Sequence, residues 1–110
     1  MGQRGLGEFE LLVLLAAARL GPEQAHAVSL AREIEERTGR ATRRSAVYIT
    51  LQRLVRKGLV SSRLGDPRPE RGGKARRMVT VEPDGDEAIR GARAALARMW
   101  DGLDPASARP

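Results

Sequence analysis

The chain contains no cysteine, only three aromatic residues and no long apolar run, and each of these absences excludes a class of protein. Without cysteine there is neither a disulfide framework nor a thiolate metal site. The longest unbroken apolar run, Leu11–Ala18, has eight residues, far fewer than the roughly 20 that a membrane-spanning helix needs. The scarcity of aromatic residues argues against the stacking platforms of single-strand binders. The N-terminus shows no secretory pattern, so a cytoplasmic location is expected.

Groups that could build a catalytic or metal centre are also scarce. His26 is the only histidine, and the residues around it form no recognisable metal-ligand or catalytic pattern. The three glutamates of segment 33–36 fit a solvated helix face better than a pair of catalytic carboxylates. Gly72-Gly73 does not belong to a phosphate-binding loop of the Walker type, because no serine or threonine follows Lys74. We therefore expect a protein that is not an enzyme and that uses no cofactor and no metal.

Positive charge is abundant, and it is concentrated in one segment. The chain has 20 Lys and Arg residues against 14 Asp and Glu residues, a formal net charge of +6. Residues 40–77 hold 12 of the basic residues and only two acids, whereas the remainder of the chain carries a net charge of −4. The basic segment coincides with a predicted helix followed by a predicted hairpin. This combination is typical of a DNA-binding winged helix.

Hydrophobic periodicity and turn residues predict four helices and one β-hairpin. The predicted helices cover residues 7–20, 29–38, 44–58 and 83–103, and the predicted strands cover 59–64 and 76–82. Ser29 is the expected N-cap of the second helix, and Gly39 is its expected C-terminal stop. The fold class is therefore mainly α with a small β-hairpin. We predict a winged helix-turn-helix domain over 6–82, a C-terminal dimerisation helix over 83–103 and a flexible tail over 104–110.

The helix expected to start at Arg44 or Ser45 has two contrasting faces. Its apolar positions, which share one side at about 100° per residue, are Val47, Leu51, Leu54 and Val55. The opposite side is polar and basic, as a helix that enters the DNA major groove requires. The residues expected to enter or border that groove are Arg43, Arg44, Ser45, Tyr48, Ile49, Gln52 and Arg53. On the wing, phosphates or the adjacent minor groove are expected to meet Arg71, Lys74 and Arg76.

The last predicted helix carries more apolar surface than a small winged-helix core requires. Its apolar positions alternate at spacings of three and four residues, which is typical of a coiled-coil seam, and a tryptophan lies beside them. The residues expected to form a dimer interface are Ile89, Ala92, Leu96, Met99, Trp100 and Leu103. The first helix is apolar on nearly every side, so it also needs cover from more than one direction. Together the two surfaces predict a two-fold homodimer, with ligand stacking as the alternative role for Trp100.

Three segments of the chain resemble the PadR family of transcriptional regulators. They are Gly7-Glu8-Phe9-Glu10-Leu11-Leu12-Val13-Leu14, the pattern Tyr48-x-x-Leu51-x-Arg53-Leu54-x-x-x-Gly58-Leu59-Val60, and Pro69-Glu70-Arg71-Gly72-Gly73. The resemblance extends over about residues 6–100. It implies a winged helix-turn-helix homodimer that usually represses transcription, with the C-terminal helix as the dimerisation element. The chain is similar to the short subfamily, which lacks a larger C-terminal domain.

These observations predict a sequence-specific transcriptional regulator that binds double-stranded DNA as a homodimer and represses transcription from a pseudo-palindromic operator. The alternative is a winged-helix module that binds an acidic protein partner through the same basic surface. A steep salt dependence, together with discrimination between duplex sequences, would separate the two. RNA is disfavoured as a ligand because aromatic residues are few. A small-molecule effector is compatible with this prediction, although the sequence does not identify one.

Overall fold

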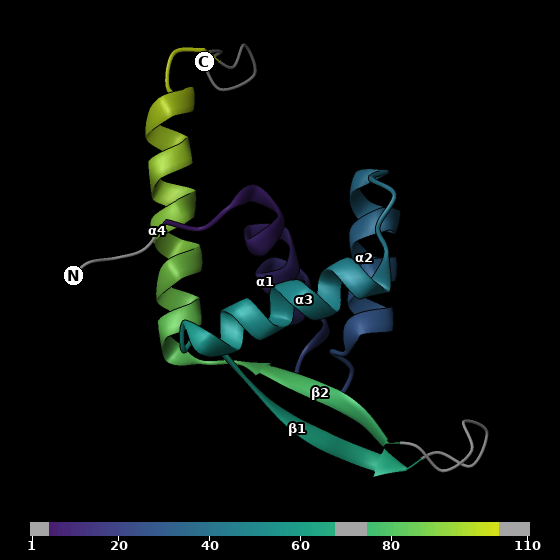
Figure 1. The fold of residues 1–110 in the computed structure, drawn as a ribbon. Helices are drawn as coiled ribbons and strands as arrows, with labels where there is room; N and C mark the ends of the chain where they lie inside the picture. Colours follow the sequence, from purple (N-terminus) through teal and green to yellow (C-terminus); the bar gives the residue numbers. More distant parts are fainter. Residues whose placement is uncertain (1–4, 68–74, 104–110) are drawn as a thin grey trace.

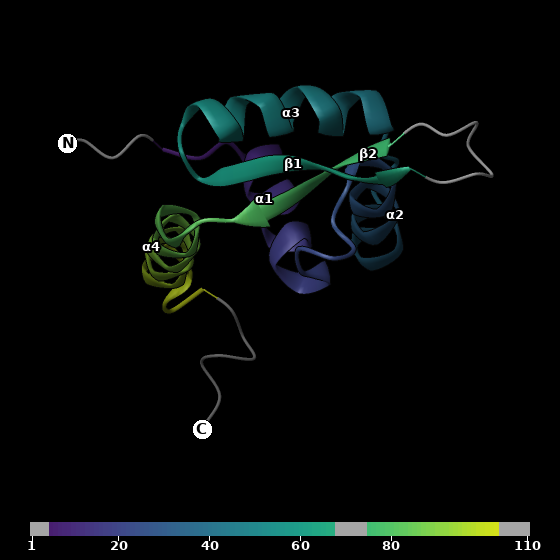
Figure 2. The same cartoon turned by 90° about the horizontal axis from the view of Figure 1, so that it is seen from below.

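The computed structural model describes residues 5–67 and 75–103 and has four helices and one hairpin (Figure 1). Along the chain the elements are α1 (Glu8–Leu20), α2 (Ala27–Thr38), α3 (Arg44–Arg56), β1 (Val60–Pro67), β2 (Ala75–Val81) and α4 (Pro83–Trp100). The hairpin runs beside α3, and α4 stands on the opposite side of the molecule from α2 (Figures 1 and 2). The predicted mainly α fold with a small β-hairpin is confirmed. The predicted tail, 104–110, lies outside the described residues.

The start of α2 differs from the prediction. Ser29 was expected to cap this helix, but His26 is the N-cap and the helix begins at Ala27. The hydroxyl oxygen of Ser29 accepts a hydrogen bond from the backbone N–H of His26 at 3.0 Å, and the Ser29 N–H lies 3.4 Å from His26 Nδ1. Histidine is not among the preferred N-cap residues, so the local pattern favoured the serine. The predicted stop is correct, because Gly39 ends the helix in the left-handed conformation.

The core forms where α1, α2 and α3 meet, around the fully buried side chains of Leu14, Leu30 and Leu54. Three of the four apolar positions predicted for α3 are buried, but the prediction for Val55 is wrong, because 39% of this residue is exposed. Thr50 is buried instead, with only 4% of its surface exposed. α3 is thus rotated so that the centre of its buried face lies toward Thr50 and its Val55 edge faces the hairpin.

β1 is longer than the predicted strand 59–64, β2 is shifted by one residue from the predicted strand 76–82, and the hairpin contacts the loop before α2. Residue pairs run from Val60 opposite Val81 to Leu64 opposite Arg77, and an irregularity follows before Pro67. Val79 is buried, and its backbone N–H donates to the carbonyl of Ala25 at 3.0 Å. This bond fixes the base of the hairpin against the helical core.

α4 begins in close contact with the backbone of the hairpin. The N–H of Glu82 donates to the carbonyl of Leu59 at 2.9 Å, and Pro83 occupies the first helical turn as predicted. A Cβ atom on Gly85 would lie 2.3 Å from the Leu59 carbonyl oxygen, so only glycine permits this approach. The helix ends at Trp100, and Leu103, which the sequence placed in the same helix, lies beyond it.

An ion pair joins the first turn of α1 to the end of α3. Lys57 Nζ lies 2.9 Å from Oε1 and 3.0 Å from Oε2 of Glu10, and the backbone N–H of Gly7 donates to Oε1 at 2.9 Å. Partial burial opposes ionisation of the Glu10 carboxyl. The hydrogen bonds from Gly7 and Lys57, with the charges of Lys57 and Arg53, outweigh that effect and hold the pKa of Glu10 below its ordinary value.

We expect Glu10→Gln to lower the free energy of unfolding by about 1–3 kcal/mol at neutral pH, because Lys57 would lose its charged partner. Since the folded-state pKa is lowered, the stabilisation by Glu10 is present above the unfolded-state pKa and is lost as pH falls through the folded-state value. Urea denaturation from neutral pH down to about pH 3 should therefore show a shallower acid loss in the variant. The control is Glu8→Gln, since that side chain is exposed and lies 3.9 Å from Arg40. Equal acid profiles for wild type and Glu10→Gln would contradict this assignment.

Candidate nucleic-acid interface

The face of α3 that points away from the core is exposed along its whole length (Figure 2). Every residue of this helix and its N-cap that was predicted to meet DNA is exposed: Arg43, Arg44, Ser45, Tyr48, Ile49, Gln52 and Arg53. The structure therefore brings these seven side chains together on one continuous surface. A polar and basic helical face of this kind is suited to reading base edges in the major groove.

The hairpin lies beside α3 and adds a second basic element. Of the three wing residues predicted to contact DNA, Arg76 lies on β2, whereas Arg71 and Lys74 fall outside the described residues. Arg76 is half-buried, and its Nη1 lies 3.2 Å from Nε2 of His26. A neutral imidazole has one acceptor nitrogen, so a given tautomer of His26 can accept either from Arg76 at Nε2 or from the Ser29 N–H at Nδ1. Arg76 thus also connects the hairpin to the start of α2.

The basic residues of the central segment divide into two groups by their partners. Three of them lie close to carboxylates: Arg40 is 3.9 Å from Glu8, Lys57 is 2.9 Å from Glu10 and Arg63 is 3.6 Å from Glu23. Within residues 5–67 and 75–103, four others make no side-chain ion pair or hydrogen bond: Arg43, Arg44, Arg53 and Arg56. Among the described residues, Arg77 of β2 contacts only the hydroxyl of Ser62, so the described positive charge of this segment that lacks a carboxylate partner lies on α3, on its N-cap and on this strand.

Two further cationic residues border the exposed face although the sequence pattern did not single them out as DNA contacts. Arg56 lies one turn beyond Gln52 and is exposed. A helical projection places it between Ser45 and Ile49, so the periodicity contained this signal. Arg77 follows Arg76 on β2 and is also exposed. Its placement depends on the register of the hairpin, which no local pattern specified.

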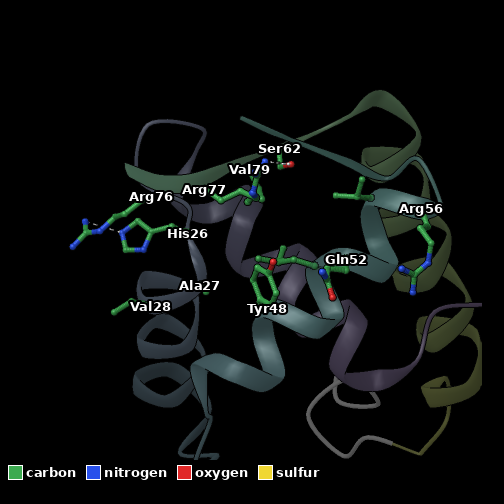
Figure 3. A pocket seen from close by; sticks show the side chains of 12 residues that line it. His26, Ala27, Val28, Tyr48, Gln52, Arg56, Ser62, Arg76, Arg77 and Val79 are labelled. Carbon is green, nitrogen blue, oxygen red and sulfur yellow. Dashed lines mark hydrogen bonds between the residues drawn. The ribbon is translucent and has the colours of Figure 1, made fainter. Parts of the chain in front are cut away.

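A cavity of about 560 Å³ opens between the flank of α3, the two strands and the first turn of α2 (Figure 3). Tyr48 and Gln52 belong both to its wall and to the exposed face of α3. The sequence did not predict this cavity, because its walls come from segments far apart in the chain, such as those of His26 and Arg76, which are 50 residues apart.

A second, apolar surface lies between α1 and α4. From Arg93 onward every residue of α4 is exposed, including Leu96 at 45%, Met99 at 75% and Trp100 at 56%. Side chains from both helices, among them Leu15 and Leu96, line a groove of about 400 Å³. Earlier in the predicted interface, Ile89 and Ala92 are half-buried, and Ile89 packs against the core of its own chain.

The described residues offer little for other kinds of site. No cluster of three or more His, Cys, Asp or Glu side chains within residues 5–67 and 75–103 could hold a metal ion. None of the helices described has the length and apolar character needed to span a membrane.

Three helices, a hairpin beside the third helix and an exposed basic face on that helix define a winged-helix protein.

The comparison with protein families identifies the class more closely. The model of the transcriptional regulator PadR-like family matches residues 14–91, which is more than half of the chain. The chain therefore belongs to the PadR-like family, and it is a DNA-binding transcriptional regulator. This confirms the resemblance seen in the sequence motifs. No curated protein sequence matches the chain.

Solved structures share the fold at low sequence identity. A PadR family transcriptional regulator from Eggerthella lenta DSM 2243 is 23% identical, with a TM-score of 0.68 over 87% of this chain and 82% of that one. A PadR family regulator from Clostridium difficile R20291 is 15% identical, with a TM-score of 0.67 over 88% and 94%. Bordetella bronchiseptica BpsR, whose DNA binding is regulated by 6-hydroxynicotinic acid, is 20% identical, with a TM-score of 0.57 over 92% and 65%.

Proposed function

We propose that the protein is a homodimeric repressor that recognises a specific double-stranded DNA sequence through α3. The observation that carries this proposal is the set of arginines on and before α3 that form no side-chain ion pair or hydrogen bond with described residues, interspersed with the exposed groups Tyr48 and Gln52. Arginine and glutamine can each make bidentate hydrogen bonds to base edges, whereas arginine also binds phosphates. In this arrangement Gln52 and Arg53 read bases, and Arg44 and the hairpin contact the backbone.

The homodimer is proposed from the apolar surface of α4 and α1. The exposed side chains of Leu96 and Trp100 line a groove together with Leu15 of α1, and a second copy of the same surface would cover both helices at once. Self-complementary contacts of this type generate a two-fold axis. A two-fold axis would present two copies of α3 to successive turns of the same duplex.

Selection of bound duplexes from a random pool should yield a pseudo-palindrome whose half-site centres lie roughly 10 bp apart, or a multiple of that spacing. Binding should weaken steeply with salt, since released counterions drive the association. A single unrepeated half-site would count against the dimer, and equal binding of all duplexes would favour a role in protein interaction. Repression itself is tested by transcription in vitro from a promoter that carries the selected site, where added protein should reduce the transcript.

Gln52→Ala or Arg53→Ala is expected to relax sequence preference, because a good bidentate base contact contributes about 1–3 kcal/mol of discrimination. Arg77→Ala on the hairpin is the matched comparison. It should weaken all duplexes alike and reduce the slope of log affinity against log salt by about one unit. Competition binding of the selected site and a scrambled duplex measures both effects. If Arg77→Ala altered the preference while both α3 variants retained it, the hairpin would be the reading element.

A further inference from the structure

Ile49 is an aliphatic residue on the basic face of α3, and 51% of its surface is exposed. At about 100° per residue it lies nearly opposite the buried side of the helix, which includes Leu51 and Leu54. Several half-buried apolar side chains of the described chain pack against the core, but Ile49 is not among them. Packing within the described core therefore does not explain an apolar residue at this position.

The surroundings of Ile49 differ from those of other exposed apolar side chains. Leu15 and Leu96 line the groove between α1 and α4, and Val55 borders the cavity beside the hairpin. Ile49 belongs to neither lining. Single exposed aliphatic side chains are common on protein surfaces, so the chemistry around Ile49 decides what it can contact.

The neighbours of Ile49 on the helix surface are polar or cationic. Residues three and four positions apart adjoin one another on a helix, and those around Ile49 include Ser45, Gln52 and Arg53, all of them exposed. The arrangement is one small aliphatic group bordered by hydrogen-bond donors. It fits a surface on which a small apolar group is bordered by hydrogen-bond acceptors and negative charge. An apolar protein partner would need a wider patch.

We propose that Ile49 recognises the 5-methyl group of a thymine in the DNA major groove. Among the groups that base pairs present there, the thymine methyl is the one alkyl group, and purine N7 and carbonyl oxygens supply acceptors around it. This pattern matches the aliphatic side chain of Ile49 and the donors that flank it. The role rests on the proposed function, in which α3 enters the major groove.

The position of Gln52 indicates where this thymine lies within the half-site. Gln52 follows Ile49 by three residues, which is about 4.5 Å along the helix axis. Successive base pairs are about 3.4 Å apart. The thymine contacted by Ile49 should therefore lie within about one or two base pairs of the base that Gln52 contacts.

Deoxyuridine is the matched probe, because it pairs with adenine as thymidine does and its base lacks only the 5-methyl group. Each thymine of the selected duplex is replaced in turn, in one half-site and then in both, and affinity is measured at one fixed salt concentration. At one thymine position we expect wild-type protein to lose about fourfold in affinity per half-site, which corresponds to the burial of one CH2-sized group. Replacement in both half-sites should cost about 15-fold, since the two-fold axis repeats the contact.

Variants of α3 separate this contact from an effect of the methyl group on DNA shape. Ile49→Ala should bind the thymine and deoxyuridine duplexes equally at that position, and it should retain its fold because Ile49 is exposed. Ile49→Val keeps a branched side chain and should keep most of the preference for thymine. Val55→Ala is the matched control, since it removes aliphatic atoms from the flank of α3 beside the hairpin. It should lose affinity for the deoxyuridine duplex as wild type does.

Three results would overturn the proposal while the selected duplex is still bound specifically. The first is a half-site without thymine, or one in which no replacement lowers the affinity. The second is an equal loss on deoxyuridine replacement in wild type and Ile49→Ala, which would assign the effect to the DNA itself. The third is loss of the thymine preference in Val55→Ala as well as in Ile49→Ala. In each case the proposed function stands, whereas equal binding of all duplexes by wild type would refute both that function and this role of Ile49.

Discussion

Replacing Leu96 by aspartate is expected to convert the protein to monomers and to abolish tight operator binding. Leu96 lies in the exposed half of α4 and borders the groove shared with Leu15 of α1. Truncating a buried leucine typically costs roughly 2–5 kcal/mol, and an unpaired charge in an apolar interface costs more. In a two-fold interface both losses occur twice. Sedimentation velocity measures the mass, and duplex titration measures the affinity.

Ala94→Asp is the matched control for this experiment. Ala94 is exposed on the same helix and does not line the groove, so the same charge is introduced without entering the proposed interface. It should leave the dimer intact. Because Leu96 is 45% exposed in the single chain, the Leu96→Asp monomer should retain its helical circular dichroism. A stable Leu96→Asp dimer with unchanged DNA affinity would place the interface elsewhere.

Gly85→Ala is expected to destabilise the fold at the junction of the hairpin and α4. Its new methyl group would lie 2.3 Å from the carbonyl oxygen of Leu59 and 2.8 Å from Cγ1 of Val81. The Leu59 carbonyl cannot withdraw freely, because it accepts the hydrogen bond from Glu82 that starts the helix. Overpacking of this kind costs about 1–3 kcal/mol or more, which exceeds the gain of up to about 1 kcal/mol in helix propensity.

Gly91→Ala, on the same helix, is expected to stabilise the protein rather than to destabilise it. Apart from its chain neighbours and the backbone of its own helix, no atom lies within 4 Å of a Cβ built at Gly91, so the substitution should stabilise α4 by about 0.5–1 kcal/mol. Urea denaturation of both variants therefore separates the close contact at Gly85 from the general effect of replacing glycine. If the two variants gained equal stability, the approach of α4 to Leu59 would not constrain the fold. A destabilised junction should also loosen the dimer, since α4 joins the proposed interface to the DNA-binding elements.

Local patterns in the sequence were sufficient for most of the fold. Periodicity near 3.6 residues predicted which side of α3 packs inward, and turn residues separated the helices from the hairpin. These signals are local, because each depends on neighbours a few residues apart along one element. The incorrect predictions for Val55 and Ser29 show where these local signals fail. The orientation of α3 against the hairpin exposed the valine, and a preceding histidine capped α2 in place of the serine.

Some features of the candidate DNA-binding interface were determined by the sequence alone, and others only by the tertiary structure. The sequence alone determined that positive charge gathers between residues 40 and 77 and that the exposed side of one helix there is basic. The tertiary structure decided which of those charges are compensated, since Lys57 meets Glu10 across 47 residues of chain. It also created the cavity between α2, α3 and the hairpin, whose lining residues are distant in sequence. Charge and periodicity are properties of a segment, whereas ion pairs and cavities depend on distances between segments, and packing alone sets those distances.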